Sequence, residues 1–311
     1  MSHNPSDAYT FTVFTSTYNR RDTIPRVYES LLAQTFRDFE WLVVDGGTDS
    51  TDEFILRCSE ENSSFPIRYF RQENRGKHGA INLGVTEARG RFFLILDDDD
   101  ECVPETLERF KSLWEAIPDP ERSRFAGICA LCTDELGQIV GNEFPQDVID
   151  SSFPEIRHRY RVRGEKFYLF LTSVLKEFPF PEEPTIRIIP EGIIWDRISG
   201  KYRIRFVNEP LRCYRRDQRQ LTRGLPHEHA GGNCITIREL LDETVGWFRF
   251  DPIYFVKNAA HYSRFSLHLG RGLVGPLKSL ANPWARALFC LTLPLGVVAY
   301  LRDRIVATHG A

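Results

Sequence analysis

Residues 92–101 read FFLILDDDDE, five apolar residues followed by five acids. An uninterrupted apolar run is typical of a strand that is covered on both faces. Four adjacent aspartates repel one another unless a cation lies among them. Mg²⁺ and Mn²⁺ favour such oxygen ligands, together with phosphate oxygens and water. A solvated acidic loop is the alternative, but the position directly after a buried strand favours a metal site.

Strand and helix patterns alternate around this stretch. We predict strands at residues 11–15, 41–44, 67–70 and 92–96, and helices at 24–32, from a capping box at Ser50 and Glu53, at 79–88 and from Pro104. This order predicts an α/β fold with a doubly wound, mostly parallel sheet. Ligands bind such sheets beyond the carboxyl ends of the strands. We therefore expect three polar turns to cluster at one edge: residues 17–19, 45–47 and 97–101.

Composition excludes several classes of protein. The chain has 311 residues, 42% hydrophobic and 27% charged, which indicates a globular protein rather than a disordered or coiled-coil one. Its net charge of −3 gives no basic signature for nucleic acid. Seven scattered cysteines and the absence of a secretory signal favour a reduced, cytoplasmic protein. Cys129 and Cys132 have metal-like spacing, but in a predicted apolar strand cysteine behaves as a small hydrophobic residue.

The turn at residues 45–47 and the segment at residues 74–82 could contact a nucleotide. Gly46 and Gly47 would let the backbone approach a planar ligand closely, and Asp45 could accept hydrogen bonds from a base or a ribose. The segment Asn74–Asn82 places cations beside glycines at a helix N-terminus, which suits an anionic ligand. Taken alone, each pattern is equally typical of an ordinary loop.

Together these motifs resemble the family 2 glycosyltransferases, whose nucleotide-sugar-binding fold is called GT-A. The resemblance covers about residues 10–225. The matching segments are TYNR (17–20), SLLAQTF (30–36), FEWLVVD (39–45), GKHGAINLG (76–84) and LDDDD (96–100). It implies a GT-A domain over residues 1–225, followed by a helical extension over 226–311 that could associate with a membrane.

The resemblance also implies an activity. The chain would be an inverting, metal-dependent transferase of polysaccharide biosynthesis, with Mg²⁺ or Mn²⁺ as its cofactor. It would move a sugar from a nucleoside-diphosphate sugar, with a UDP-sugar favoured, to a hydroxyl of a surface glycan or a lipid-linked saccharide. The alternative is a catalytically silent nucleotide-sugar-binding or scaffold subunit on the same fold.

Roles for individual residues follow from the matching positions. Asp97 and Asp99 correspond to the two acids of the family's D-x-D motif, with Asp99 binding the metal and Asp97 near the ribose. The remaining predicted donor-binding residues are Thr17, Tyr18, Asp45, Lys77 and Asp98. One departure concerns the turn after the second strand, which reads Asp45-Gly46-Gly47-Thr48-Asp49 and is one residue shorter than is usual in the family.

The second half of the chain supplies the expected base. The family usually has a Glu-Asp pair opening a helix, and here Gly192 replaces the Asp and leaves Glu191. Glu191 could take the proton of the acceptor hydroxyl. Asp196 is a competing candidate, about 140° around the same predicted helix. Arg215 and Arg216 could clamp a diphosphate, or they could belong to a solvated basic loop.

The chain ends in an apolar segment. Residues 287–301 carry no charge, and a helix of that length spans about 22 Å, which is shorter than a bilayer core. Pro294 is expected to interrupt it. A segment lying in the membrane interface, with Trp284 and Tyr300 as its amphipathic ends, is one interpretation, and a buried core helix is the other. We therefore expect a cytoplasmic protein that could lie at the cytoplasmic face of a membrane.

Overall fold

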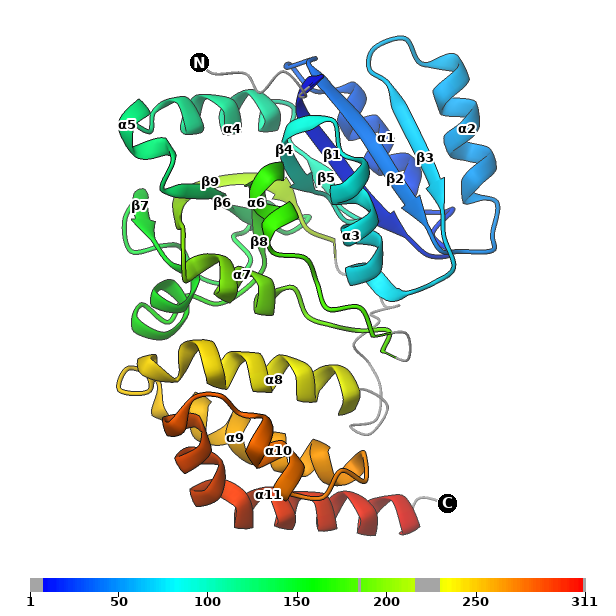
Figure 1. Ribbon diagram of the computed structural model, residues 1–311. Coiled ribbons are helices and arrows are strands. Elements are labelled where there is room, and N and C mark those ends of the chain that lie inside the picture. The colour runs from blue at the N-terminus through cyan, green and yellow to red at the C-terminus, as the bar shows by residue number, and fades with distance from the viewer. Residues whose placement is uncertain (1–7, 184–185, 216–229, 310–311) are drawn as a thin grey trace. The chain divides into compact units, whose positions relative to one another are not determined.

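The computed structural model describes residues 8–183, 186–215 and 230–309, arranged in two compact units (Figure 1). The first unit comprises residues 1–184 and 201–218, and the second comprises residues 185–200 and 219–311. The chain therefore leaves the first unit and returns to it before the C-terminal helices begin. The predicted boundary at residue 225 falls outside the described residues and stays a prediction.

A nine-stranded sheet organises the first unit. Its strands follow the order β3-β2-β1-β4-β8-β6-β9-β5, and β7 pairs with β9. The pairs β3–β2, β2–β1 and β1–β4 are parallel, and β8 pairs with β4 in antiparallel orientation. The predicted α/β class and the mostly parallel central sheet are confirmed. The strands are β1 (Tyr9–Thr17), β2 (Phe39–Asp45), β3 (Ile67–Arg71), β4 (Gly90–Ile95), β5 (Glu101–Cys102), β6 (Phe125–Thr133), β7 (Val148–Ser151), β8 (Lys166–Leu171) and β9 (Arg203–Cys213).

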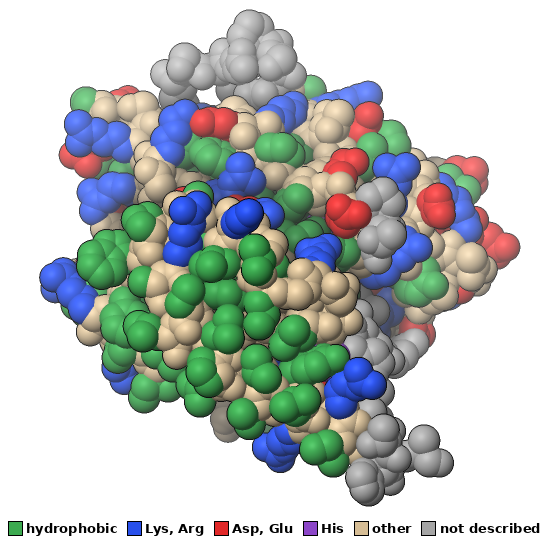
Figure 2. Space-filling view, turned by 60° about the horizontal axis from the view of Figure 1, so that its bottom comes forward, with side chains coloured by type: hydrophobic (Ala, Val, Ile, Leu, Met, Phe, Trp, Pro, Cys, Tyr) green, Lys and Arg blue, Asp and Glu red, His purple; other side chains and the backbone are tan. Residues whose placement is uncertain are grey.

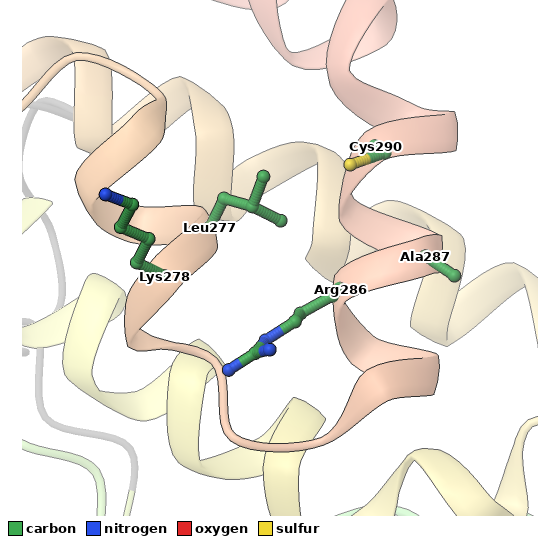
Figure 3. A pocket seen from close by; sticks show the side chains of 5 residues that line it. All are labelled: Leu277, Lys278, Arg286, Ala287 and Cys290. Atoms are coloured by element: carbon green, nitrogen blue, oxygen red, sulfur yellow. The ribbon is translucent and has the colours of Figure 1, made fainter.

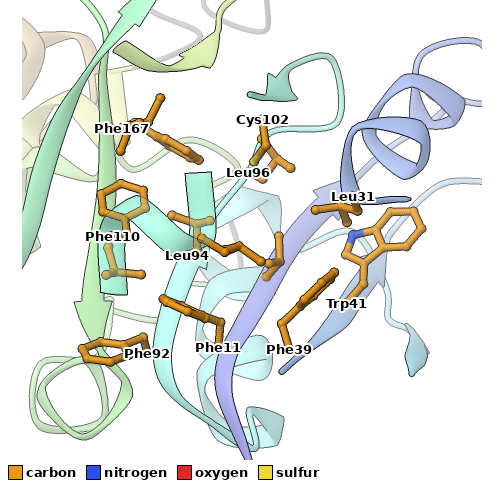
Figure 4. Close-up of a cluster of buried hydrophobic side chains, with 14 of the residues drawn as sticks. Phe11, Leu31, Phe39, Trp41, Phe92, Leu94, Leu96, Cys102, Phe110 and Phe167 are labelled. Atoms are coloured by element: carbon orange, nitrogen blue, oxygen red, sulfur yellow. The ribbon is translucent and has the colours of Figure 1, made fainter. Parts of the chain in front are cut away.

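Helices cover both faces of this sheet. The apolar residues that α1, α2 and α4 bury form one cluster with Phe11, Trp41, Leu94 and their neighbours (Figure 4). Helix α3 packs against β1 and β2 on the opposite side of the sheet. Each fully buried Leu or Phe side chain of this cluster stabilises the fold by about 1.5–3 kcal/mol relative to an exposed one. The helices of this unit are α1 (Ile24–Leu32), α2 (Thr51–Glu61), α3 (Gly76–Glu87), α4 (Thr106–Glu115), α5 (Asp119–Arg122), α6 (Thr172–Glu177) and a π-helical turn, η1 (Glu155–Arg159).

Two local predictions were wrong in detail. The helix after Ser50 forms, but the side chain of Ser50 makes no capping hydrogen bond. Instead, Asp49 Oδ1 accepts from the Thr51 N–H at 3.2 Å. The two β-rich stretches within residues 125–140 also predict a hairpin around residues 134–137, but β6 is followed there by a single bridge between Thr133 and Ile139. Asp134 explains this, since its Oδ1 accepts from the backbone N–H groups of Leu136 and Gln138 and closes a tight turn.

The second unit is helical, as predicted for the C-terminal extension. Its core joins α8 and α9 to α11 through buried side chains such as Leu241, Phe255, Tyr262 and Phe289. The helices are α7 (Gly192–Ser199), α8 (Ala230–Thr244), the 3₁₀ turn η2 (Val245–Trp247), α9 (Pro252–His268), α10 (Val274–Ser279) and α11 (Pro283–His309). The predicted interruption at Pro294 does not occur, because α11 continues through it.

Candidate functional site

The carboxyl ends of β1, β2 and β4 bring the three polar turns together. Thr17 and Asp45 are paired in the register of β1 and β2. Arg20, after β1, places its Nε 3.9 Å from Oδ1 of Asp98, after β4. The predicted clustering of the turns at one edge of the sheet is therefore confirmed.

The four aspartates divide into outer and inner members. Asp97, Asp98 and Asp99 are half-buried, whereas Asp100 is fully buried. The backbone N–H of Asp100 donates to the carbonyl of Asp97 at 3.2 Å, which closes a turn that directs Asp100 inward. Oδ1 of Asp100 accepts from the backbone N–H of Arg215 at 2.9 Å. Asp100 thus anchors the turn, while the side chains of Asp97, Asp98 and Asp99 are partly exposed to solvent.

A buried arginine that the sequence did not reveal compensates part of this charge. Arg212, from β9, lies 3.7 Å from Asp97 Oδ2 and 3.3 Å from Asp100 Oδ2 through its Nη1. Its Nε also donates to Cys132 Sγ at 3.3 Å. A lone arginine in a strand pattern carries no functional signal, so only the pairing of β9 with β5 and β6 shows where it points.

The local charges move the pKa values of the aspartates in opposite directions. Burial alone would raise the pKa of Asp97, but Lys77, whose Nζ lies 2.5 Å from Oδ1, and Arg212 outweigh it and lower that pKa. Burial and the charge of Asp99 raise the pKa of Asp98 to about 7. Burial raises the pKa of Asp100 to about 7, although Arg212 opposes the rise. Asp98 and Asp100 therefore take up a proton more readily than an ordinary aspartate, whereas Asp97 keeps its charge to lower pH.

Asp45 organises its own turn. Its Oδ1 accepts from the Gly47 N–H at 2.6 Å, and its Oδ2 accepts from the Tyr69 hydroxyl at 2.9 Å. Burial, followed by this hydrogen bond, raises the pKa of Tyr69 to about 12. Asp45 is fully buried, and its contact with a base stays a prediction. Tyr69 is a partner that the sequence pattern of β3 gave no reason to single out.

The shortened turn is joined to the turn after β1. Asn19 has a left-handed backbone with φ of 56°, and its Oδ1 accepts from the Thr48 N–H at 2.7 Å. A Cβ on Gly47 would lie 2.6 Å from the Asn19 backbone nitrogen. The approach of these glycines to a ligand stays a prediction. In the structure, Gly47 lets two protein turns approach each other.

This contact predicts that Gly47→Ala destabilises the first unit. The added methyl would overlap Asn19, so we expect a loss of about 1–3 kcal/mol in the free energy of unfolding. Denaturant titration measures the loss, with Gly246→Ala as the control, because a Cβ there meets nothing within 4 Å. Equal stabilities of the two variants would contradict the interpretation.

The remaining predicted residues lie in different environments. Thr17 is buried and Tyr18 is exposed beside it. Arg215 Nε lies 2.6 Å from Glu101 Oε1, so it is tied to the acidic turn, while Arg216 falls outside the described residues. Glu191 belongs to the second unit, where it directly precedes α7 and is half-buried. Its role as the base stays a prediction.

The donor chemistry of the acidic turn fits a hard divalent cation. Asp97, Asp98 and Asp99 offer carboxylate oxygens, which Mg²⁺ and Mn²⁺ prefer. Within the described part of the chain, no group of three or more His, Cys, Asp or Glu side chains forms a full ligand set. A cation here would therefore be held by one or two carboxylates, with Asp99 the foremost candidate, and by the ligand's own oxygens.

Residues 12–166 match the family model described as glycosyl transferase family 2. An uncharacterized glycosyltransferase of Haemophilus influenzae is 29% identical over 137 residues, covering 44% of this chain and 45% of its own length. A GalNAc(5)-diNAcBac-PP-undecaprenol beta-1,3-glucosyltransferase of Campylobacter jejuni is 24% identical over 209 residues, covering 65% of this chain and 63% of its own. The chain thus spans less than two thirds of either relative.

Solved structures share the fold. S. aureus TarS 1-349 superposes with a TM-score of 0.64 at 16% identity, covering 97% of this chain and 92% of its own. The same protein in complex with UDP-GlcNAc gives a TM-score of 0.61 at 17% identity, over 91% of this chain and 79% of its own. A Pyrobaculum calidifontis mannosyltransferase in complex with GDP-Man and Mn²⁺ gives 0.53 at 20% identity, over 98% and 88%.

Proposed function

Because the chain belongs to glycosyl transferase family 2, we propose that it transfers a sugar from a nucleoside-diphosphate sugar to a hydroxyl group. The observation that carries the proposal is the convergence of Asp97, Asp98 and Asp99 with Lys77 and Arg20 at the carboxyl edge of a parallel sheet. Carboxylates that can share a cation with a diphosphate, beside side chains of positive charge, suit a nucleotide-sugar donor.

Three of these similar proteins support a proposal for the donor and the acceptor. A UDP-sugar is favoured because the TarS structure holds UDP-GlcNAc, although the mannosyltransferase structure holds GDP-Man. The Campylobacter relative is named for a lipid-linked saccharide. We therefore propose a hydroxyl of a surface glycan or a lipid-linked saccharide as the acceptor, in polysaccharide biosynthesis at the cytoplasmic face of a membrane.

The proposed reaction is a single displacement with inversion. The acceptor oxygen forms a bond to the anomeric carbon, and the bond from that carbon to the diphosphate oxygen breaks with its electron pair. The hydroxyl proton passes to Glu191. A Mg²⁺ or Mn²⁺ ion held by Asp99 would neutralise charge on the diphosphate when bound. Lys77 and Arg215 would attract the donor's phosphates.

Nucleotide-sugar turnover tests this proposal. Purified protein with Mn²⁺ and a panel of nucleotide sugars should release a nucleoside diphosphate from one donor. A thermal-shift screen of the same panel measures binding separately.

The second candidate function is a catalytically silent nucleotide-sugar-binding or scaffold subunit. It is favoured by Gly192 in place of an acid and by the burial of Asp45. It predicts a thermal shift without release.

Two matched variants test the base. Glu191→Gln is expected to lower the rate of diphosphate release by about 10²–10⁴-fold, because a general base contributes about that much. Its thermal shift with the donor should be unchanged. Asp196→Asn is the comparison, since Asp196 is only 5% exposed within α7. If Asp196→Asn lost the rate and Glu191→Gln kept it, the assignment would be reversed.

A further inference from the structure

The outer face of α11 is an exposed apolar stripe, which we define by Trp284, Leu291, Leu295, Val298, Leu301 and Ile305. Trp284 is 76% exposed and Leu291 is 79% exposed. The six side chains recur at helical spacing along 22 residues, or about 33 Å. Figure 2 shows a broad area of hydrophobic side chains on the face of the molecule turned toward the viewer, with Lys and Arg around its margins. A continuous apolar surface of this length marks an interaction site.

The inner face of the same helix is fixed to its own unit. Ala285, Leu288, Phe289 and Thr292 are buried, and Leu288 and Phe289 belong to the core that α8 and α9 share. Near the other end, Arg264 of α9 forms two bonds to Asp303, at 2.6 and 2.7 Å. One side of α11 therefore packs against its own unit along the helix, and the other side is exposed to solvent.

This attachment decides between lying on a bilayer and crossing it. By length and composition, residues 283–305 could span a membrane, contrary to our estimate from the shorter uncharged run. A spanning helix would have to carry Asp303 and its partner Arg264 into or across the hydrocarbon, which is costly. A helix with one face on protein and the other bare suits the plane of the interface.

The charges of this region are mostly positive. Between Pro252 and Ile305 the sequence has seven Lys and Arg but one acid, Asp303, a net charge of +6 in a chain whose total is −3. Asp303 is bonded to Arg264 and to His268. Arg286 and Arg302 are exposed toward either end of the outer face. An anionic surface complements such an arrangement, at about 1 kcal/mol for each Lys or Arg that comes near it.

A pocket adjoins the outer face at its N-terminal end. It has a volume of about 420 Å³ and lies between α10 and α11, lined by Leu277, Lys278, Arg286, Ala287 and Cys290 (Figure 3). Leu277, Ala287 and Cys290 line it with apolar side chains, and Lys278 and Arg286 bring two basic residues beside it, with Arg286 Nε donating to the Leu280 carbonyl at 2.6 Å. Basic residues beside an apolar pocket suit a phosphate group joined to acyl chains.

We propose that the outer face of α11, with the neighbouring pocket, docks on the surface of an anionic phospholipid bilayer, with α11 lying in the plane of the interface. This inference rests on the membrane location within the proposed function, but not on the transfer chemistry. The apolar stripe enters the boundary of the acyl chains, and Lys278, Arg286 and Arg302 contact lipid phosphates.

Co-sedimentation of the full chain with vesicles tests the proposal. We expect binding to phosphatidylcholine vesicles that contain phosphatidylglycerol, and at least about tenfold weaker binding by Leu291→Glu. Leu136→Glu is the matched control, because Leu136 is 81% exposed in a turn of the first unit. Equal binding by Leu291→Glu and the wild type, or no binding by the wild type, would overturn the proposal.

The charge contribution has a separate measurement. Lys278→Gln with Arg302→Gln should weaken binding by about 25-fold, since each charge contributes about fivefold, and added salt should do likewise. Equal binding to vesicles of phosphatidylcholine alone would refute the choice of an anionic surface.

Cys290 is exposed, whereas the other described cysteines are buried or half-buried. The emission of a fluorophore attached to Cys290 should therefore shift to the blue when vesicles are added.

Two controls separate this inference from other outcomes. Sedimentation equilibrium without lipid should show the same mass for the wild type and Leu291→Glu. A dimer that Leu291→Glu dissociates would assign the face to a second copy instead. Release of nucleoside diphosphate without vesicles should be unchanged by Leu291→Glu, so a failure of docking is distinguishable from a failure of the proposed transferase activity.

Discussion

Asp99→Asn is expected to lower nucleoside-diphosphate release by about 10²–10³-fold, the effect of removing one group that stabilises charge in a transition state. Asp99 is half-buried in a turn whose inner member, Asp100, holds the backbone in place. Asparagine has almost the same shape as aspartate but lacks its charge, so the turn should keep its conformation. The measurement is the rate of release at saturating Mn²⁺, together with the melting temperature.

The control for this variant is Asp119→Asn, which makes the same chemical change at an exposed position in α5. It should release diphosphate at the wild-type rate. If Asp99→Asn kept the wild-type rate with an unchanged melting temperature, Asp99 would not hold the cation and the proposed mechanism would be wrong.

Arg212→Met is expected to cost about 3–5 kcal/mol in the free energy of unfolding. Arg212 is 4% exposed, and its guanidinium lies within 3.7 Å of carboxylate oxygens of Asp97, Asp100 and Glu165. Removing one partner from a buried ion pair leaves an uncompensated buried charge, which is the cause of a loss of this size. Denaturant titration measures it.

An exposed pair in the same unit provides the comparison. Arg109 makes two bonds to Glu209, at 2.9 and 2.7 Å, but its side chain is 45% exposed. Arg109→Met should therefore cost less than about 1 kcal/mol. Arg212→Lys should fall between the two, because it keeps the charge and loses the fork that reaches several carboxylates. Similar losses for Arg212→Met and Arg109→Met would contradict a buried network.

Patterns of local sequence were enough to predict the four parallel strands β1 to β4, the helices between them and the edge where the polar turns meet. Apolar runs and helical spacing depend only on neighbouring residues, so the strands and the start of α2 could be placed. The burial of Asp100 beside three partly exposed aspartates could not be predicted, because its partners Arg212 and Arg215 come from β9 and the residues after it. The contacts of Tyr69 and Gly47 could not be predicted either, since their partners lie on other strands and turns. The length of α11 was underestimated because its flanking charges, which bounded the apolar run, do not end a helix.

The path of the chain between the two units limits how the protein can be divided. Residues 185–200 belong to the unit of the C-terminal helices, yet β9 of the first unit follows them in the sequence. A stop placed after β9 would therefore leave α7 without α8, the helix that it contacts. The helices that we propose to meet lipid would thus also support the segment that carries Glu191, and no single cut along the chain would separate the proposed membrane attachment from the proposed catalysis.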